Sequence, residues 1–128
     1  MKTFAIVFAS LFNLLAFGST YAHGDHDPKH GGTVGRGDDD IVIEFVMHKG
    51  TVTLYVEDDT GKPIATKDIK GTLTLVAPQR AGQEVKLVSA GNNKFTATGL
   101  APVPGDRLRA RITLPSGEEL ESVSLVGK

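Results

Sequence analysis

Short runs in which apolar and polar residues alternate constrain the fold of this chain more than any other feature. The clearest run is residues 107–114, in which every second residue is apolar and three of the residues between them are arginine. Successive side chains of a β-strand point to opposite faces, so this period of two predicts a half-buried strand. No stretch has a convincing helical periodicity. The pattern therefore predicts an all-β fold.

Further runs of the same kind are separated by glycine, proline, asparagine and aspartate. Residues 41–48 and 51–57 flank Lys49-Gly50, which suits a tight hairpin turn. The other expected strands are residues 72–76, 84–89, 94–98 and 120–126. This spacing predicts a single immunoglobulin/fibronectin-like β-sandwich of about seven strands over residues 41–128.

Two stretches of this predicted domain fit the pattern less well. Residues 64–69 suit a short helix or an edge strand equally. The alternation slips in phase between Leu120 and Val123, which predicts a β-bulge in the last strand.

The first 22 residues have the features of a cleaved export signal. Lys2 supplies a positive charge, an apolar stretch runs from Phe4 to Phe17, and small residues lead to Ala22. Asn13 and Gly18 leave this stretch short of the roughly 20 apolar residues that a spanning helix needs. We therefore expect a signal peptide over residues 1–22, a periplasmic protein beginning at His23, and no membrane insertion after cleavage.

Composition excludes several classes of function. The chain has no cysteine, which rules out disulfides, thiolate metal sites and cysteine nucleophiles. The formal charge of −1 becomes −2 once Lys2 is removed with the leader, which argues against a nucleic-acid partner. No arrangement of serine, histidine and acid with an ordered histidine can be assembled, so we expect no catalytic residues, no organic cofactor and no enzymatic activity.

Residues 23–40 differ in composition from the rest. They include three histidines, five aspartates and five glycines, with Val34 as the one large aliphatic residue. Such a segment has too little apolar surface to order itself as part of a core. We therefore expect a flexible His/Asp/Gly-rich arm whose removal leaves the stability of the domain nearly unchanged.

Three histidines within eight residues of this arm predict a metal site, because imidazole is the commonest metal ligand in proteins. A free α-amine on His23 could join its ring Nδ1 in one chelate. Nitrogen and oxygen donors in a tetragonal array favour Cu(II), with nickel or, in a tetrahedral set, zinc as alternatives. The candidate ligands are His23, Asp25, His26, Asp27 and His30, with His48 at the hairpin end as a further candidate.

Each of these assignments has an alternative that the sequence leaves open. The arm could be a solvated tether whose histidines bind metal only incidentally. His48 could be an exposed turn residue, and Met47 ordinary core packing. A calcium site at Asp38-Asp39-Asp40 is disfavoured, because this run lacks the spacing of a calcium-binding loop.

Two stretches carry a family resemblance: His30-Gly-Gly32, and IEFVMHKGTVTLYVEDDTGKPI over residues 43–64. Together they resemble the N-terminal His-Gly-Gly β-domain of periplasmic adaptor subunits of heavy-metal RND efflux systems and, more distantly, CopC-type copper carriers. The resemblance covers residues 30–125, and its specific part is the hairpin. It implies a periplasmic β-sandwich associated with metal export. The chain lacks the adaptors' helical hairpin and lipoyl-like segments, and it lacks the methionine-rich stretch of some copper carriers.

Two functions follow as hypotheses. The first is a periplasmic metal-binding protein for copper or another divalent heavy metal, which acts in metal handling, efflux or resistance. Its partners would be the metal ion and a periplasmic efflux component or metal carrier. The second is a non-enzymatic structural or protein-interaction module in which the histidines are incidental.

Overall fold

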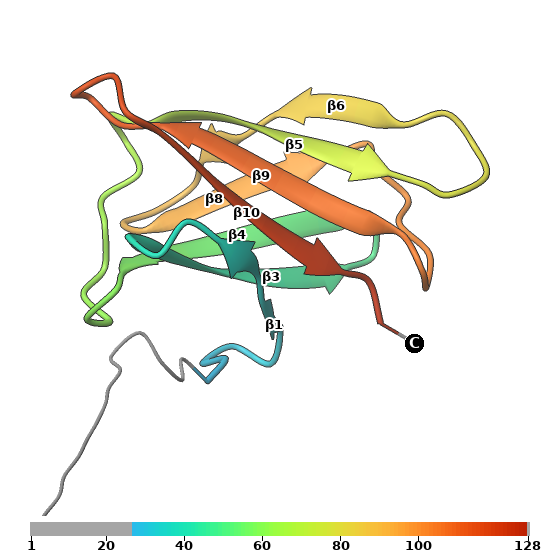
Figure 1. The fold of residues 1–128 in the computed structure, drawn as a ribbon, viewed down its shortest axis with the longest axis horizontal. Helices are drawn as coiled ribbons and strands as arrows, with labels where there is room; N and C mark the ends of the chain where they lie inside the picture. The colour runs from blue at the N-terminus through green and yellow to red at the C-terminus, as the bar shows by residue number, and fades with distance from the viewer. Residues whose placement is uncertain (1–26, 128) are drawn as a thin grey trace, which may run out of the picture.

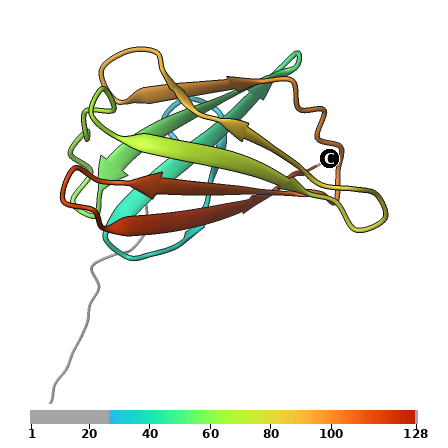
Figure 2. The ribbon, with the colours of Figure 1, turned by 90° about the horizontal axis from the view of Figure 1, so that it is seen from above.

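A computed structural model describes residues 27–127, which form two antiparallel sheets of five strands each. Figure 1 and Figure 2 show the sheets as two layers. The first sheet has the order β1 (Thr33–Val34), β3 (Ile41–His48), β4 (Thr51–Asp58), β8 (Lys94–Thr98) and β7 (Val88–Ser89). The second has the order β2 (Arg36–Gly37), β10 (Glu119–Leu125), β9 (Arg107–Thr113), β5 (Lys70–Val76) and β6 (Gln83–Lys86). The predicted all-β sandwich is therefore confirmed.

The alternation of apolar residues located the main strands well. β3 and β8 have the predicted bounds, and the other long strands differ from prediction by a few residues. At the β3–β4 turn both central residues have positive φ, 46° at Lys49 and 85° at Gly50. This is the backbone of a tight hairpin turn whose twist matches that of the strands it joins.

The core lies between the sheets and is built from every second residue of the long strands. The first sheet contributes Ile43, Phe45, Leu54 and Phe95, and the second contributes Leu73, Leu75, Leu108 and Ile112, all with at most 2% of their surface exposed. The predicted inward face of β9 is thus confirmed for Leu108, Ala110 and Ile112, while Leu114 is only partly buried against the core.

The predicted bulge in the last strand is wrong. β10 pairs with β9 without interruption from Glu119↔Thr113 to Leu125↔Arg107. The apparent slip arises because the inward residues are Ser122 and Ser124, both buried, so that small polar side chains stand where aliphatic ones were expected.

The region that the sequence left open, residues 64–69, is neither a helix nor a strand. It is a loop anchored by Thr66, which is completely buried. The Thr66 hydroxyl lies 2.7 Å from Ser89 Oγ and donates to the Lys94 carbonyl at 3.0 Å. A buried hydroxyl with these partners ties the loop to the β7–β8 edge of the first sheet.

Each open side of the sandwich is closed by one segment that changes sheets. On one side the chain leaves β1 in the first sheet, turns at Gly35, and enters β2 in the second sheet. On the other side it leaves β6 in the second sheet, passes Leu87, and enters β7 in the first sheet. The edge strands are therefore short, which limits the unpaired backbone that they offer to other chains.

The prediction of a flexible arm that ends at residue 40 is wrong for residues 33–37. Thr33 and Val34 pair with β3, Arg36 and Gly37 pair with β10, and the Asp38 amide donates to the Glu121 carbonyl at 3.0 Å. The low apolar content of residues 33–37 suggested a flexible segment, but backbone hydrogen bonds, rather than buried apolar side chains, hold it in place. The domain therefore includes part of the segment that was assigned to the arm. The predicted signal peptide, residues 1–22, and the first four residues of the predicted arm, residues 23–26, lie outside the described residues.

Gly35 allows the crossover between the sheets, and an alanine there should destabilise the fold. A Cβ at this position would meet the Ser122 hydroxyl and lie 2.6 Å from a Phe45 ring carbon. We expect Gly35→Ala to lower the free energy of unfolding by about 1–3 kcal/mol, the usual cost of overpacking. Urea denaturation followed by circular dichroism would measure it. Gly127→Ala is the control, because nothing lies within 4 Å of a Cβ there. Equal stability of the two variants would contradict the expectation.

Candidate functional site

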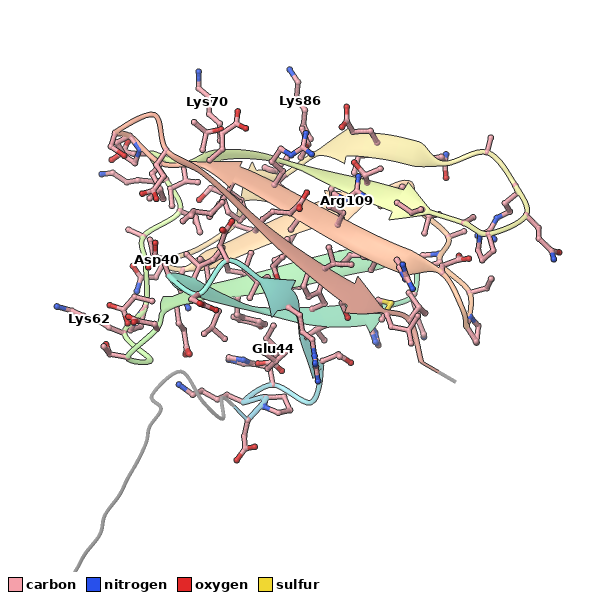
Figure 3. The ribbon with its side chains drawn as sticks, in the orientation of Figure 1. Asp40, Glu44, Lys62, Lys70, Lys86 and Arg109 are labelled. Carbon is pink, nitrogen blue, oxygen red and sulfur yellow. The ribbon has the colours of Figure 1, made fainter. Side chains whose placement is uncertain are left out.

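Glu44 is a buried carboxylate on the outer face of the first sheet. Its neighbours Ile43 and Phe45 point into the core, so the alternation along β3 turns Glu44 outward. It is nevertheless only 5% exposed. The cause is the segment of residues 29–32, here called the covering segment, which lies against this face and leads into β1. Figure 3 shows Glu44 next to this segment.

The Glu44 carboxylate accepts four hydrogen bonds from the covering segment. Oε1 accepts from the Lys29 amide at 2.9 Å and lies 3.0 Å from His30 Nδ1. Oε2 accepts from the His30 and Gly32 amides, both at 2.8 Å. Each oxygen thus has two partners, which is close to what an ionised carboxylate can accept. The covering segment is folded around this one charge.

These contacts act on the pKa of Glu44 in opposite directions. Burial alone would raise the pKa of the carboxyl group, but the hydrogen bond with the His30 side chain and those from the Gly32, Lys29 and His30 amides together hold it below its ordinary value of 4.5. Glu44 is therefore ionised at neutral pH.

His30 is held in a defined orientation by two contacts. Its ring is stacked on the ring of Tyr55 in β4, with centroids 3.6 Å apart and an angle of 3° between the planes. Its Nδ1 faces the Glu44 carboxylate. A neutral imidazole that donates from Nδ1 keeps its lone pair on Nε2. With 40% of its side chain exposed, His30 is accessible from solvent.

Glu44 and His30 have the arrangement of the carboxylate–histidine pairs in many metal sites. In those sites a carboxylate accepts a hydrogen bond from one ring nitrogen of the histidine, which fixes the tautomer and makes the other ring nitrogen a better metal ligand. The described residues supply this one oriented donor. They contain no group of three or more histidine, cysteine, aspartate or glutamate side chains that could hold a metal ion. A site at His30 with three or more such ligands would need at least one from outside the described residues.

Lys29 and Asp27 lie on the same side of the site. The Lys29 ammonium forms an ion pair of 2.7 Å with Glu57 on β4. Asp27 is exposed, and together with Glu44, Tyr55 and Glu57 it lines a hollow of about 10 Å³. That volume admits about one water-sized group, so the hollow is too small for an organic ligand.

The structure separates the predicted ligands. His30 is at the Glu44 site and Asp27 is near it, while His23, Asp25 and His26 lie outside the described residues. His48 is exposed at the β3–β4 turn. It is on the same face as Glu44 but four residues further along β3, a separation of about 13 Å at the rise of a strand. We therefore do not assign His48 to the same site as His30.

Glu44 and Tyr55 were not predicted as site residues. The available signal was Glu44 itself, the one charged residue at positions 41–47, where the other six residues are apolar. A charge in the middle of such a strand requires partners, which the sequence does not identify. Tyr55 carried no signal of its own, because its contact with His30 depends on where the covering segment crosses the sheet.

No protein-family model matches this chain, and comparison with curated proteins and with solved structures found no match.

The described part of the chain has no helix long and apolar enough to cross a membrane.

Replacing Glu44 by glutamine should destabilise the protein markedly. Both carboxylate oxygens have two partners, so the amide nitrogen would face hydrogen-bond donors in either orientation. We expect Glu44→Gln to lower the free energy of unfolding by about 2 kcal/mol or more. Glu57→Gln removes one ion pair with a half-exposed lysine and should cost at most about 1 kcal/mol. Urea denaturation of both variants tests this, and equal losses would contradict the role given to Glu44.

The difference in stability between wild type and Glu44→Gln should depend on pH. Because folding lowers the pKa of Glu44, its contribution is fully present above the unfolded value near 4.5 and is lost as the pH falls through the folded value. The difference should therefore shrink as the pH falls below about 4.5. The pKa values of Asp58 and Asp106 are also lowered, by hydrogen bonds from Thr60 and from Arg80 respectively. Wild type and Glu44→Gln both contain these two carboxylates, so their effect on stability cancels in the difference. A difference that keeps growing as the pH falls below about 4.5 would contradict the lowered pKa of Glu44.

Proposed function

We propose that this chain is a periplasmic metal-binding protein, with His30 as a ligand and Cu(II) as the metal it binds most tightly. It would act in the handling, efflux or resistance of copper or another divalent heavy metal. The observation that carries the proposal is the Glu44–His30 pair, in which a buried carboxylate fixes an accessible imidazole with Nε2 free to bind a metal.

His30 cannot complete a metal site by itself. His23, Asp25, His26 and Asp27 precede it within seven residues, so the chain can supply nitrogen and oxygen donors to one ion. Nitrogen and oxygen donors, without thiolates, favour Cu(II) or Ni(II) in a tetragonal set and zinc in a tetrahedral one. In this proposal His30 is the fixed point at which the other ligands assemble.

The alternative is a structural or interaction module without a physiological metal. The same contacts would then serve only to fasten the covering segment to the first sheet. The two proposals differ in one property, which is the affinity of the His30 nitrogen for a metal ion.

Tyrosine fluorescence can measure metal binding at His30 directly. The chain has two tyrosines and no tryptophan, so a protein of residues 23–128 has Tyr55 as its one strong fluorophore. Cu(II) is a paramagnetic quencher, and a copper ion on the ring stacked against Tyr55 should quench its emission at one equivalent. His30→Ala should abolish tight quenching, and Glu44→Gln should weaken the affinity by about 10–100-fold. His48→Ala is the matched control and should behave as wild type.

Two results would count against a metal site at His30. Quenching that is unchanged in His30→Ala would place the copper elsewhere. Absence of quenching at several equivalents of Cu(II), in a protein that is folded by circular dichroism, would favour the alternative function. Titrations with Zn(II) and Ni(II) in competition with Cu(II) would then rank the metals for any site that is found.

Metal binding should also stabilise the fold. Because His30 is attached to β3 through Glu44, a metal bound there favours the folded state over the unfolded one. The gain should approach about 2.7 kcal/mol at a hundredfold excess over Kd, reduced by any binding to the unfolded chain. A thermal scan with and without Cu(II) measures it. Wild type should show a rise in midpoint that His30→Ala lacks, whereas a flexible arm would give no rise in either.

A further inference from the structure

We propose that the outer face of the second sheet, centred on Arg107, binds an acidic segment of a partner protein. This face is on the opposite side of the sandwich from the Glu44 site. Figure 3 shows Arg109 on β9 in one layer and Glu44 at the other layer. The proposal is independent of the metal function.

Apolar and basic side chains are combined on this face. The register places Val76, Arg107 and Leu125 directly opposite one another on three neighbouring strands, β5, β9 and β10. Val76 is 36% exposed and Leu125 is 58% exposed. The described residues include four exposed large aliphatic side chains, and two of them flank this one arginine. Arginine is enriched at protein–protein interfaces and among the residues that contribute most to binding, and the two exposed aliphatic side chains beside it add apolar surface that a partner can bury.

The face also carries an excess of positive charge. The next row of the sheet has Arg109 between Thr74 and Val123, and Val123 pairs with Arg36. Arg111 follows in the row after that, so that all three arginines of β9 share this face. Glu121 is 3.4 Å from Arg109 and 3.3 Å from Arg111, which leaves Arg107 outside this ion-pair group. The positive charge next to the aliphatic patch is therefore that of Arg107.

The distribution of charge on this face favours a protein with separate carboxylates as the partner, rather than a membrane or a nucleic acid with a continuous negative surface. Glutamates 84, 119 and 121 lie among the basic residues of the same sheet and would repel a bilayer or a nucleic acid, which present negative charge everywhere. A protein can place single carboxylates opposite the arginines and avoid the glutamates. Guanidinium groups also bind carboxylates in a bidentate manner, which favours arginine at such a position. The partner segment should combine acidic with aliphatic side chains.

A peptide that alternates glutamate with leucine and valine is a suitable probe, with the same peptide carrying glutamine for glutamate as the control. Titration into ¹⁵N-labelled protein of residues 23–128 should shift amide signals of β5, β9 and β10, and added salt should weaken the binding. Arg107→Glu should lower the affinity at least about tenfold. Lys62→Glu makes the same change of charge in the turn after β4, and it should leave the affinity within about twofold.

The same spectra report folding, so a loss of binding cannot be confused with a loss of structure. Four results would overturn the proposal: no shifts with the acidic peptide, equal binding of the glutamine peptide, equal effects of Arg107→Glu and Lys62→Glu, or shifts with phosphatidylglycerol vesicles but not with the peptide. The last would identify the face as a lipid-binding surface. Sedimentation of the free protein can give a fifth such result: a dimer broken by Arg107→Glu would mean that a second copy covers the face instead.

Discussion

The hydrogen bonds to the Glu44 carboxylate are the interaction on which the N-terminal part of this structure depends. A buried charge is costly unless it is fully solvated by donors, and the four donors of the covering segment meet that need. The backbone amides of a glycine-rich segment equally require acceptors. The Glu44 carboxylate would not be stable in its buried position without the covering segment, and the segment would not be ordered without the carboxylate. Each therefore holds the other in place.

The position of His30 is therefore linked to the closure of the sandwich. The covering segment continues into β1, the Gly35 crossover and β2, which together close one side of the molecule. Release of the contacts to Glu44 would free the start of this edge as well as the imidazole. A histidine fixed in this way has less conformational entropy to lose on binding a ligand than one in a flexible arm, and preorganisation of this kind increases affinity.

The fold was more predictable from the sequence than the site. The main strands follow from a local pattern, because alternation along one strand reports which of its faces is buried. The pattern failed at Ser122 and Ser124, where buried positions carry small polar residues, and in residues 33–37, which are held by backbone hydrogen bonds rather than by apolar burial. His30 could be proposed from its residue type. Glu44 and Tyr55 could not, because their roles depend on a contact between segments 14 or more residues apart in the chain.

The two outer faces of the sandwich differ in the chemistry that they present, and distance keeps them electrostatically separate. Packed sheets lie about 10 Å apart, and side chains on the two outer faces are further apart still. The Debye length at physiological ionic strength is about 8 Å, so a divalent ion at His30 would have little direct effect on a carboxylate bound at Arg107. Any coupling between metal binding and partner binding would have to pass through the structure. The Gly35 crossover offers such a route, because it joins the strand that follows His30 to the strand paired with β10.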